Sequence, residues 1–311
     1  MELKRVISAS RRTDIPKYYP SWLAERIRDG RVEVPLPYGG WRVISLKPEE
    51  VHTIVLWSKD FSRVLADEGG VRRALERYDQ IFCHFTITGL GRSRLEPRIP
   101  HWKVAVEQIP KLIDLCGDPR RVVLRFDPIL HWREHGRVGS NLPFAEPILK
   151  EAARWGVKAI KISFVTLYRK VRRRCLWGRH QHQHQDWDWD WYEPSREERL
   201  AIARELQGLA ASLGLELYSC SDPILEEAGF RSSGCIDGEL LSELHPQGLP
   251  APKARDTGQR AECRCSVSAD IGSYEMVCPG GCLYCYANPV PVIPRTGSDQ
   301  IGLDPHRAEM G

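Results

Sequence analysis

The 311-residue chain lacks three features that would assign it to a simple class. It has no run of about 18 uninterrupted apolar residues, the length that crosses a bilayer as a helix, so no membrane partner is expected. Its first residues, MELKR, contain no apolar core of the kind found in secretory signals. With 45 basic and 41 acidic residues, it also lacks the one-sided charge of many nucleic-acid-binding proteins. We therefore expect a cytoplasmic protein.

Cysteine, in contrast, is abundant. Seven of the ten cysteines follow residue 219, and six of those lie between 235 and 285. Because thiols stay reduced in the cytoplasm, such clustering indicates metal or redox chemistry and not disulfides. The other three, Cys83, Cys116 and Cys175, fall in a predicted strand, a helix end and a basic segment, and we interpret them as structural.

Three cysteines lie in one short segment, CPGGCLYC at 278–285, with the spacing C-x3-C-x2-C. Thiolates are soft ligands, and three from one tight loop suit an iron–sulfur cluster better than a hard cation. Glycine tolerates positive φ and proline presets φ, so this backbone can wrap closely. Three protein ligands would leave one iron of a 4Fe–4S cluster open to a substrate or cofactor. The alternative is a zinc knuckle completed by Cys263 or Cys265, although such sites usually use paired C-x2-C hooks.

This segment, with its aromatic residue before the third cysteine, resembles the signature of the radical S-adenosylmethionine superfamily. GCLYCY at 281–286 is similar to the cluster loop of spore photoproduct lyase and its relatives. The resemblance implies that Cys278, Cys282 and Cys285 hold a 4Fe–4S cluster whose open iron binds S-adenosylmethionine. It further implies formation of a 5′-deoxyadenosyl radical and an electron donor such as flavodoxin or ferredoxin. Tyr284 and Tyr286 are predicted to pack against the cluster or the adenine, and the alternative is plain core packing. The superfamily usually carries this loop near the start of its barrel, so a permuted barrel, or a loop supplied from the far end, is expected here.

A second resemblance covers most of the chain. The segments ISASRRTDIP at 7–16, FTITG at 85–89 and RFDPI at 125–129, together with the terminal cysteines, are similar to an uncharacterised bacterial family. That family is known mainly as a domain of unknown function with a C-terminal cysteine cluster. The resemblance implies an intact family member and no particular reaction.

Strand and helix patterns alternate along the chain. Strands are predicted at 5–10, 42–46, 53–57, 80–88, 121–126, 157–164 and 215–219, and helices at 22–28, 61–78, 101–116, 144–155 and 195–214. The alternation predicts an α/β fold with a mostly parallel sheet, best described as a full or partial (β/α) barrel, with a doubly wound sheet as the alternative. We expect a barrel body at 1–225 with a low-complexity insertion at 172–192. A cysteine-rich iron–sulfur segment at 226–311 would complete the barrel mouth.

Polar residues follow several predicted strands, where ligands bind in parallel α/β folds. They are Arg11, Arg12, Thr13, Asp14, Lys59, Arg125 and Asp127. The first four suit S-adenosylmethionine, which offers a carboxylate for an arginine fork, an amine and a ribose. The alternative for these four is a surface ion-pair cluster. The last three are predicted to point into the barrel mouth, and the alternative is a structural role in ion pairs.

Four further cysteines, Cys220, Cys235, Cys263 and Cys265, would complete a tetrahedral set for a second cluster or a zinc ion. The alternative is that some are ordinary buried residues. The tract HQHQHQDWDWDW at 180–191 is predicted to be a mobile surface loop. Its other interpretations are adventitious metal binding by the histidines, or a lid whose tryptophans stack on a base.

These observations predict an iron–sulfur enzyme of radical S-adenosylmethionine type that abstracts hydrogen from an unknown substrate, either a small molecule or a nucleic acid. The alternative is a non-catalytic, metal-stabilised module that binds nucleic acid or protein, drawing on the basic segment at 172–174. A third interpretation is an electron-transfer protein with a closed cluster.

Overall fold

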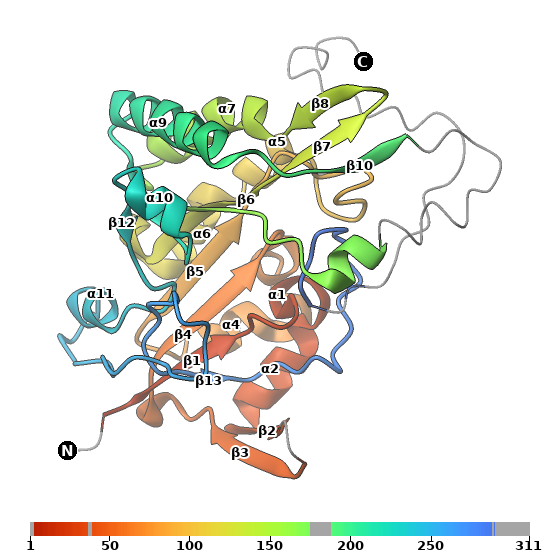
Figure 1. Ribbon diagram of the computed structural model, residues 1–311. Helices are drawn as coiled ribbons and strands as arrows, with labels where there is room; N and C mark the ends of the chain where they lie inside the picture. Colours follow the sequence, from red (N-terminus) through yellow and green to blue (C-terminus); the bar gives the residue numbers. More distant parts are fainter. Residues whose placement is uncertain (1–2, 37–38, 175–187, 288, 290–311) are drawn as a thin grey trace.

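The computed structural model describes residues 3–36, 39–174, 188–287 and 289, and shows an α/β protein (Figure 1). The strands are β1 (Arg5–Ala9), β2 (Arg31–Pro35), β3 (Trp41–Ser45), β4 (Val51–Ser58), β5 (Ile81–Thr86), β6 (Val122–Ile129), β7 (His131–Glu134), β8 (Arg137–Ser140), β9 (Ala159–Phe164), β10 (Trp189–Tyr192), β11 (Glu216–Ser219), β12 (Arg231–Ser232) and β13 (Ala269–Asp270). The α-helices are α1 (Ile15–Tyr18), α2 (Pro20–Arg28), α3 (Ser62–Leu65), α4 (Val71–Leu75), α5 (Trp102–Val106), α6 (Ile109–Cys116), α7 (Ala145–Arg154), α9 (Arg196–Ser212), α10 (Pro223–Glu227) and α11 (Gly238–Glu243). Short 3₁₀ turns are η1 (Pro48–Glu50), η2 (Glu68–Gly70), η3 (Pro119–Arg121) and η4 (Leu142–Phe144).

Eight strands form the main sheet in the order β12-β11-β9-β6-β5-β4-β1-β13, and all neighbours run parallel. From β1 to β12 the strands lie side by side in their chain order, as successive β–α units do. The last strand, β13, lies beside the first. In the described ranges no pairing joins β12 to β13. The predicted α/β class is confirmed, and the sheet is open between these two edge strands.

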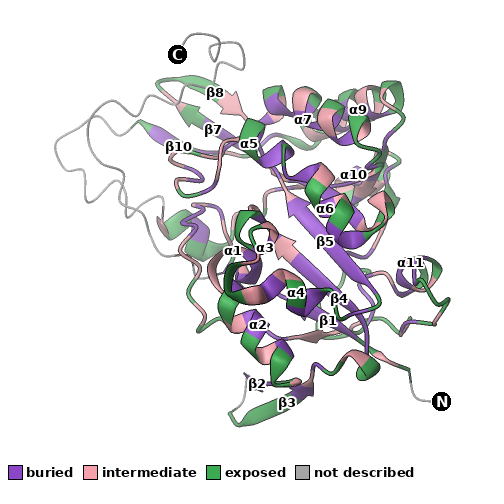
Figure 2. Cartoon of the chain, turned by 180° about the vertical axis from the view of Figure 1, so that it is seen from behind, coloured by how far each residue is buried: buried purple, intermediate pink, exposed green. Residues whose placement is uncertain are grey.

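Both faces of the sheet are covered. Ile54, Leu56 and Phe85 belong to the apolar core on the side of α2, α4 and α6, which Figure 2 shows in front of the strands. Val55 and Phe82 point to the opposite face and pack against the segment that contains α11 and residues 235–265. The interior strand β4 therefore contains the consecutive apolar residues 54–57, as expected of a strand buried on both faces. Full burial of each such side chain contributes about 1.5–3 kcal/mol to folding.

Two predicted helices are each divided in the structure. The helix predicted at 61–78 becomes α3 and α4, because Gly69 and Gly70 take positive φ values of 63° and 78° between them. The helix predicted at 101–116 becomes α5 and α6. Pro110 lies in the first turn of α6, where proline is tolerated, whereas in the interior of one long helix it would remove a hydrogen bond.

Strands outside the main sheet form two small antiparallel sheets. The predicted strand at 42–46 is β3, which pairs with β2 and not with the main sheet. The end of the tryptophan-rich tract is β10, which pairs with β7. Trp189 and Trp191 point inward and the intervening aspartate points outward, so this part of the tract is a half-buried strand and not a surface loop. The histidines of the tract, at 180, 182 and 184, lie outside the described residues.

None of the helices in the described ranges is long and apolar enough to cross a membrane.

Candidate functional site

The cysteine loop, residues 278–285, follows β13 and lies at the carboxyl ends of the strands. β13 pairs in parallel with β1, with Ile7 opposite Ala269 and Ser8 opposite Asp270. Asp270 then ties the two strand ends together, because its carboxylate accepts hydrogen bonds from the Ser8 hydroxyl (3.0 Å) and the Arg11 amide (3.0 Å). The loop consequently begins from the strand next to β1, although the two are separated by almost the whole sequence.

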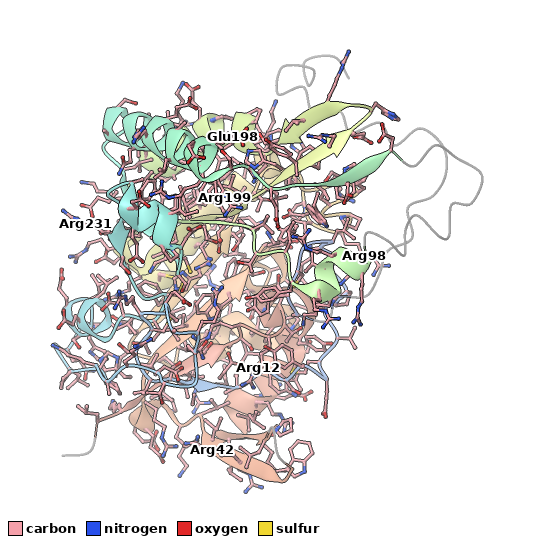
Figure 3. All side chains as sticks on the ribbon, in the orientation of Figure 1. Arg12, Arg42, Arg98, Glu198, Arg199 and Arg231 are labelled. Atoms are coloured by element: carbon pink, nitrogen blue, oxygen red, sulfur yellow. The ribbon has the colours of Figure 1, made fainter. Side chains whose placement is uncertain are left out.

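Side chains from three separate segments bind the backbone of the cysteine loop. Tyr19 donates its hydroxyl to the Val277 carbonyl at 2.6 Å, and Arg98, labelled in Figure 3, donates to the Pro279 carbonyl at 3.0 Å. Arg174 donates to the Leu283 carbonyl at 2.9 Å and also to the Cys285 and Ala287 carbonyls. Gly281 has a φ of 70°, which confirms the need for glycine at this turn.

The three thiols of the loop differ in exposure. Cys282 is buried, and Cys278 and Cys285 are half-buried. Cys282 and Tyr284 belong to an apolar cluster that also contains Trp132 and Trp189, so the small β7-β8-β10 sheet packs against this side of the site. Burial, together with the nearby Asp14 carboxylate, raises the pKa of the Cys278 thiol to about 11.

A buried carboxylate, Glu96, organises the strand ends beneath the loop. Glu96 accepts hydrogen bonds from Lys59 (2.9 Å), Thr88 (2.6 Å) and the Tyr284 hydroxyl. Burial disfavours the charged form of Lys59, but the Glu96 carboxylate 2.9 Å away outweighs it and raises the pKa of Lys59. Lys59 also lies 5.6 Å from the centre of the Tyr284 ring. The structure thus brings Lys59 and Tyr284 together around a residue that sequence reasoning missed.

The residues predicted at 11–14 diverge in the structure. Arg11 forms ion pairs with Asp256 (3.7 Å) and Asp270 (3.8 Å). Arg12 donates to the Gly272 carbonyl at 2.9 Å. Asp14 accepts from the Ser58 hydroxyl (2.7 Å) and from the Lys59 and Lys17 amides, and thereby caps α1. Burial raises the pKa of Asp14 to about 6.

Two buried hydroxyls between β1 and α2 have no hydrogen-bond partner in the described residues. They belong to Thr13 and Tyr18. A β-carbon built on Gly280 would lie 3.4 Å from the Tyr18 hydroxyl, which places that group against the loop. Buried polar groups are normally paired, so these hydroxyls indicate a place where a polar ligand would complete the hydrogen bonding.

Arg125 and Asp127 pair with each other at the end of β6. The guanidinium of Arg125 binds the Asp127 carboxylate, whose other oxygen accepts from the Ser163 hydroxyl. Arg125 also lies 5.7 Å from the centre of the Trp57 ring, and Arg11 lies 5.9 Å from the same ring. Both predicted residues thus lie at the strand ends. Arg125 also reaches the face of the sheet opposite α2, α4 and α6, which we call the inner face.

The four remaining clustered cysteines gather on that inner face. We call Cys220, Cys235, Cys263 and Cys265 the four-thiol group; all four belong to one apolar cluster. The sulfurs of Cys220 and Cys235 are 3.3 Å apart, and the Cys265 sulfur accepts a hydrogen bond from the Ile236 amide at 3.5 Å. Arg125 donates to the Cys235 sulfur at 2.8 Å. Within the described ranges no three His, Cys, Asp or Glu side chains are arranged so that they could hold a single metal ion.

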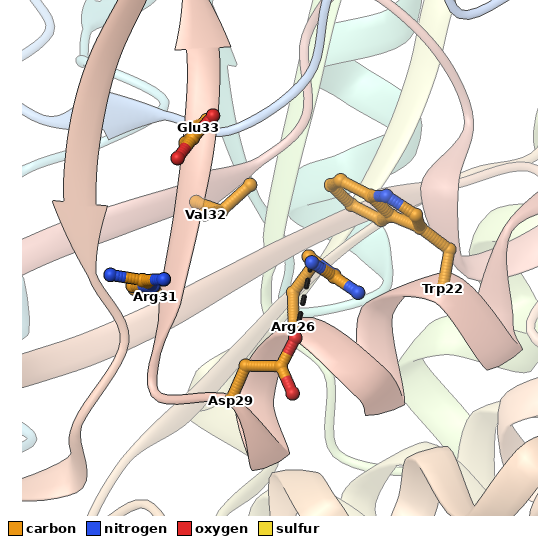
Figure 4. A pocket seen from close by; sticks show the side chains of 6 residues that line it. All are labelled: Trp22, Arg26, Asp29, Arg31, Val32 and Glu33. Carbon is orange, nitrogen blue, oxygen red and sulfur yellow. Dashed lines mark ion pairs between the residues drawn. The ribbon is translucent and has the colours of Figure 1, made fainter.

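Other candidates lie apart from these two groups. Cys83 and Cys116 are buried on the helix side of the sheet, with sulfurs 3.5 Å apart, while Cys175 lies outside the described residues. A pocket of about 760 Å³ lies between α2 and β2 (Figure 4). Its walls, which include the 3.1 Å ion pair between Arg26 and Asp29, contain none of the predicted site residues.

Sequence reasoning missed Glu96, Arg98 and Arg174 because none belongs to a spacing pattern. Glu96 is a lone acid among several arginines in the stretch 89–100, and that surplus of positive charge is the one signal that could have drawn attention to it. Arg174 was noted only as part of a basic run.

Comparison with known proteins defines the family and no more. The chain belongs to the family described as a domain of unknown function, DUF1848, whose model matches residues 6–287. The match includes most of β1 and the whole cysteine loop. No curated protein and no solved structure matches the chain.

Proposed function

We propose that this protein is an iron–sulfur enzyme of radical S-adenosylmethionine type, which reductively cleaves S-adenosylmethionine to abstract hydrogen from a substrate. The position of the cysteine loop carries the proposal. The superfamily that the loop resembles usually carries it near the start of its barrel. Here the loop follows β13, the edge strand that pairs with β1. The loop therefore lies next to the first strand of the chain, although it comes near the end of the sequence.

The donor set fits a 4Fe–4S cluster better than a single ion. Around one tetrahedral zinc, with bonds of about 2.3 Å, thiolate sulfurs lie only about 3.8 Å apart. Ligands of a cluster bind separate irons and lie farther apart, so Cys278, Cys282 and Cys285 need not surround one point. Arg174 donates to the Leu283 and Cys285 carbonyls of the loop, and Lys59 lies 5.6 Å from the centre of the Tyr284 ring. They would compensate the negative charge of a thiolate-bound cluster.

When bound, the cluster would supply one electron to the sulfonium of S-adenosylmethionine. The chain's own residues would hold that cofactor. The unpaired hydroxyls of Thr13 and Tyr18 offer hydrogen bonds, and Arg12 offers a guanidinium for a carboxylate. Trp132, Trp189 and Tyr284 would exclude water from the radical, because they form an apolar wall on one side of the loop. Arg11, Asp14, Lys59, Arg125 and Asp127 would line the strand ends.

The proposal includes a partial (β/α) barrel, open between β12 and β13, with the segment after residue 225 completing its mouth. We further propose a cytoplasmic location, with flavodoxin or ferredoxin as the electron donor. The substrate is left open between a small molecule and a nucleic acid, since neither fold nor motif determines it.

Anaerobic reconstitution followed by iron and sulfide counting and electron paramagnetic resonance tests the proposal. The reduced protein should show a 4Fe–4S signal that changes when S-adenosylmethionine is added. A Cys282→Ala variant should lose the response, and a Cys116→Ala variant should keep it. Zinc without sulfide, and no response to the cofactor, would overturn the proposal and favour the non-catalytic binding module.

A further inference from the structure

Three segments far apart in the sequence bring the four-thiol group together. Cys220 follows β11, Cys235 follows β12, and Cys263 and Cys265 precede β13. The Ser266 amide donates to the Ile236 carbonyl at 2.8 Å, and the Ile236 amide donates to the Cys265 sulfur at 3.5 Å. These bonds hold the second and third segments side by side.

The contact between those two segments is tight at the backbone. A β-carbon on Gly234 would lie only 2.5 Å from the Arg264 carbonyl oxygen, so glycine is required there for steric reasons. Cys235 and Cys265 are nearly fully buried, whereas Cys220 and Cys263 are half-buried. The two central thiols are therefore fixed by the fold, and the two outer thiols retain more freedom to rotate.

Two cations lie beside the four-thiol group, and one of them has no carboxylate partner in the described residues. Arg125 lies against Cys235 and Cys220 but is paired with Asp127. Lys161 is also buried, and its ammonium donates to the Ser233 hydroxyl at 3.0 Å and to the carbonyls of residues 233 and 234. In the described part of the chain no carboxylate pairs with Lys161. A buried cation without a counter-charge is costly, so an anionic group is expected close by.

Arg11 supplies a second, independent observation. Its Nη1 atom is buried without a hydrogen-bond partner in the described residues, even though its other nitrogens meet Asp256 and Asp270. The Asp256 amide donates to the Cys265 carbonyl at 2.9 Å, so Arg11 lies near the segment that carries Cys265. A buried guanidinium nitrogen without a partner adds positive charge on this side of the four-thiol group.

We propose that Cys220, Cys235, Cys263 and Cys265 form a second metal centre, a tetrathiolate site for a soft metal, on the inner face of the sheet. Four thiolates around Zn²⁺, or around a cluster core of charge +2, carry a net charge of −2, which Lys161, Arg125 and Arg11 would compensate. The sulfurs of Cys220 and Cys235 are already 3.3 Å apart. Rotation of the outer two side chains would close the four sulfurs around a metal.

The second centre does not depend on the proposed function, because it can be measured after the cysteine loop is disabled. The test uses the full chain with Cys278, Cys282 and Cys285 all changed to Ala. Titration of this triple variant with Co²⁺ should produce the intense visible bands of tetrahedral cobalt–thiolate coordination, at about one ion per chain. Adding Cys235→Ser or the half-exposed Cys263→Ser should weaken Co²⁺ binding at least about 100-fold. Adding Cys116→Ser, the matched control, should leave it unchanged.

Metal and sulfide analysis of the same triple variant after reconstitution identifies the native occupant. Iron with sulfide would assign an auxiliary cluster and zinc without sulfide would assign a zinc site; either supports the second centre. Absence of thiolate-type cobalt bands, or bands that survive both serine substitutions, would overturn it. So would a titration of free thiols that finds Cys220 and Cys235 joined in a disulfide.

Discussion

The cysteine loop and the four-thiol group differ in how the chain assembles them. Three thiols of the loop come from eight consecutive residues, and the fold contributes only their position at the strand ends. The four thiols of the other group come from three segments, which meet because β11, β12 and β13 belong to one sheet. A local motif is visible in the sequence, whereas a dispersed set becomes visible only in three dimensions.

The two groups also differ in their polar surroundings. The cysteine loop lies over the buried Glu96 carboxylate, which Lys59 neutralises. The four-thiol group lies among Arg11, Arg125 and Lys161, and in the described residues carboxylates pair with the first two but not with Lys161. The first site is thus electrostatically complete apart from its ligand, while the second requires negative charge from the thiols themselves.

The largest effect is expected from Cys282→Ala. This variant should lose the open-iron cluster and every response to S-adenosylmethionine, because two cysteines do not hold such a cluster. Metal bound by the four-thiol group should remain. Iron and sulfide counting on the two proteins measures the difference, and an unchanged iron content would show that the loop is not the cluster site.

Removing the buried Glu96 carboxylate tests how much it stabilises the folded protein. Glu96→Gln should lower the free energy of unfolding by about 3 kcal/mol, because the buried Glu96 carboxylate is the counter-charge of Lys59, whose side chain is only 16% exposed. Glu76→Gln, which breaks an exposed ion pair with Arg72, should cost less than about 1 kcal/mol. Urea unfolding of both variants compares them, and equal effects would contradict the role assigned to Glu96.

Arg125 tests the electrostatics of the four-thiol group. Arg125→Gln in the triple-alanine background should weaken Co²⁺ binding about 10–100-fold, since a group that hydrogen-bonds metal ligands tunes their affinity. Arg42, an exposed arginine on β3, provides the control, and Arg42→Gln should have no effect. Identical cobalt affinities in the two variants would separate Arg125 from the second centre.

The smallest effect concerns pH and the sheet that packs against the cysteine loop. Burial lowers the pKa of His131 to about 4, with Arg199 acting in the same direction and Glu198 against it. Its ring also meets Tyr192 of β10. The histidine is therefore neutral when folded at pH 5 but protonated when unfolded, so stability present above about pH 6.5 is lost as the pH falls toward 4.

Between pH 7 and pH 5, the free energy of unfolding of His131→Gln should fall by about 1 kcal/mol less than that of the wild type. This figure allows for solvent near the ring. Denaturant unfolding of wild type and variant at the two pH values measures it. A loss of stability that is the same in both proteins would assign the pH dependence to other groups.

The sequence predicted the parts of the fold that have local patterns. β1, β4, β5, β6, β9 and β11 are apolar runs, and their alternation with helices was sufficient to predict an α/β fold with a parallel sheet. The edge strands β12 and β13 are two residues long and carry no pattern, so they were missed. Yet β13 determines where the cysteine loop lies.

The candidate site was likewise predictable only where its residues form local patterns. The three loop cysteines and the polar residues after the strands were found, because motif spacing and strand ends are local features. Glu96 and the contacts of Arg174 depend on long-range packing. The residues at 11–14 were expected to act together, but backbone geometry at the end of β1 directs Arg11 toward the inner face and Asp14 toward β4.

The most direct test of the account is the formation of 5′-deoxyadenosine. The reconstituted, chemically reduced protein should be incubated anaerobically with S-adenosylmethionine, and the product quantified by mass spectrometry. We expect 5′-deoxyadenosine from the wild type and from Cys116→Ala, and none from Cys282→Ala. A protein that carries its full iron and sulfide but releases no 5′-deoxyadenosine would contradict the proposed radical chemistry.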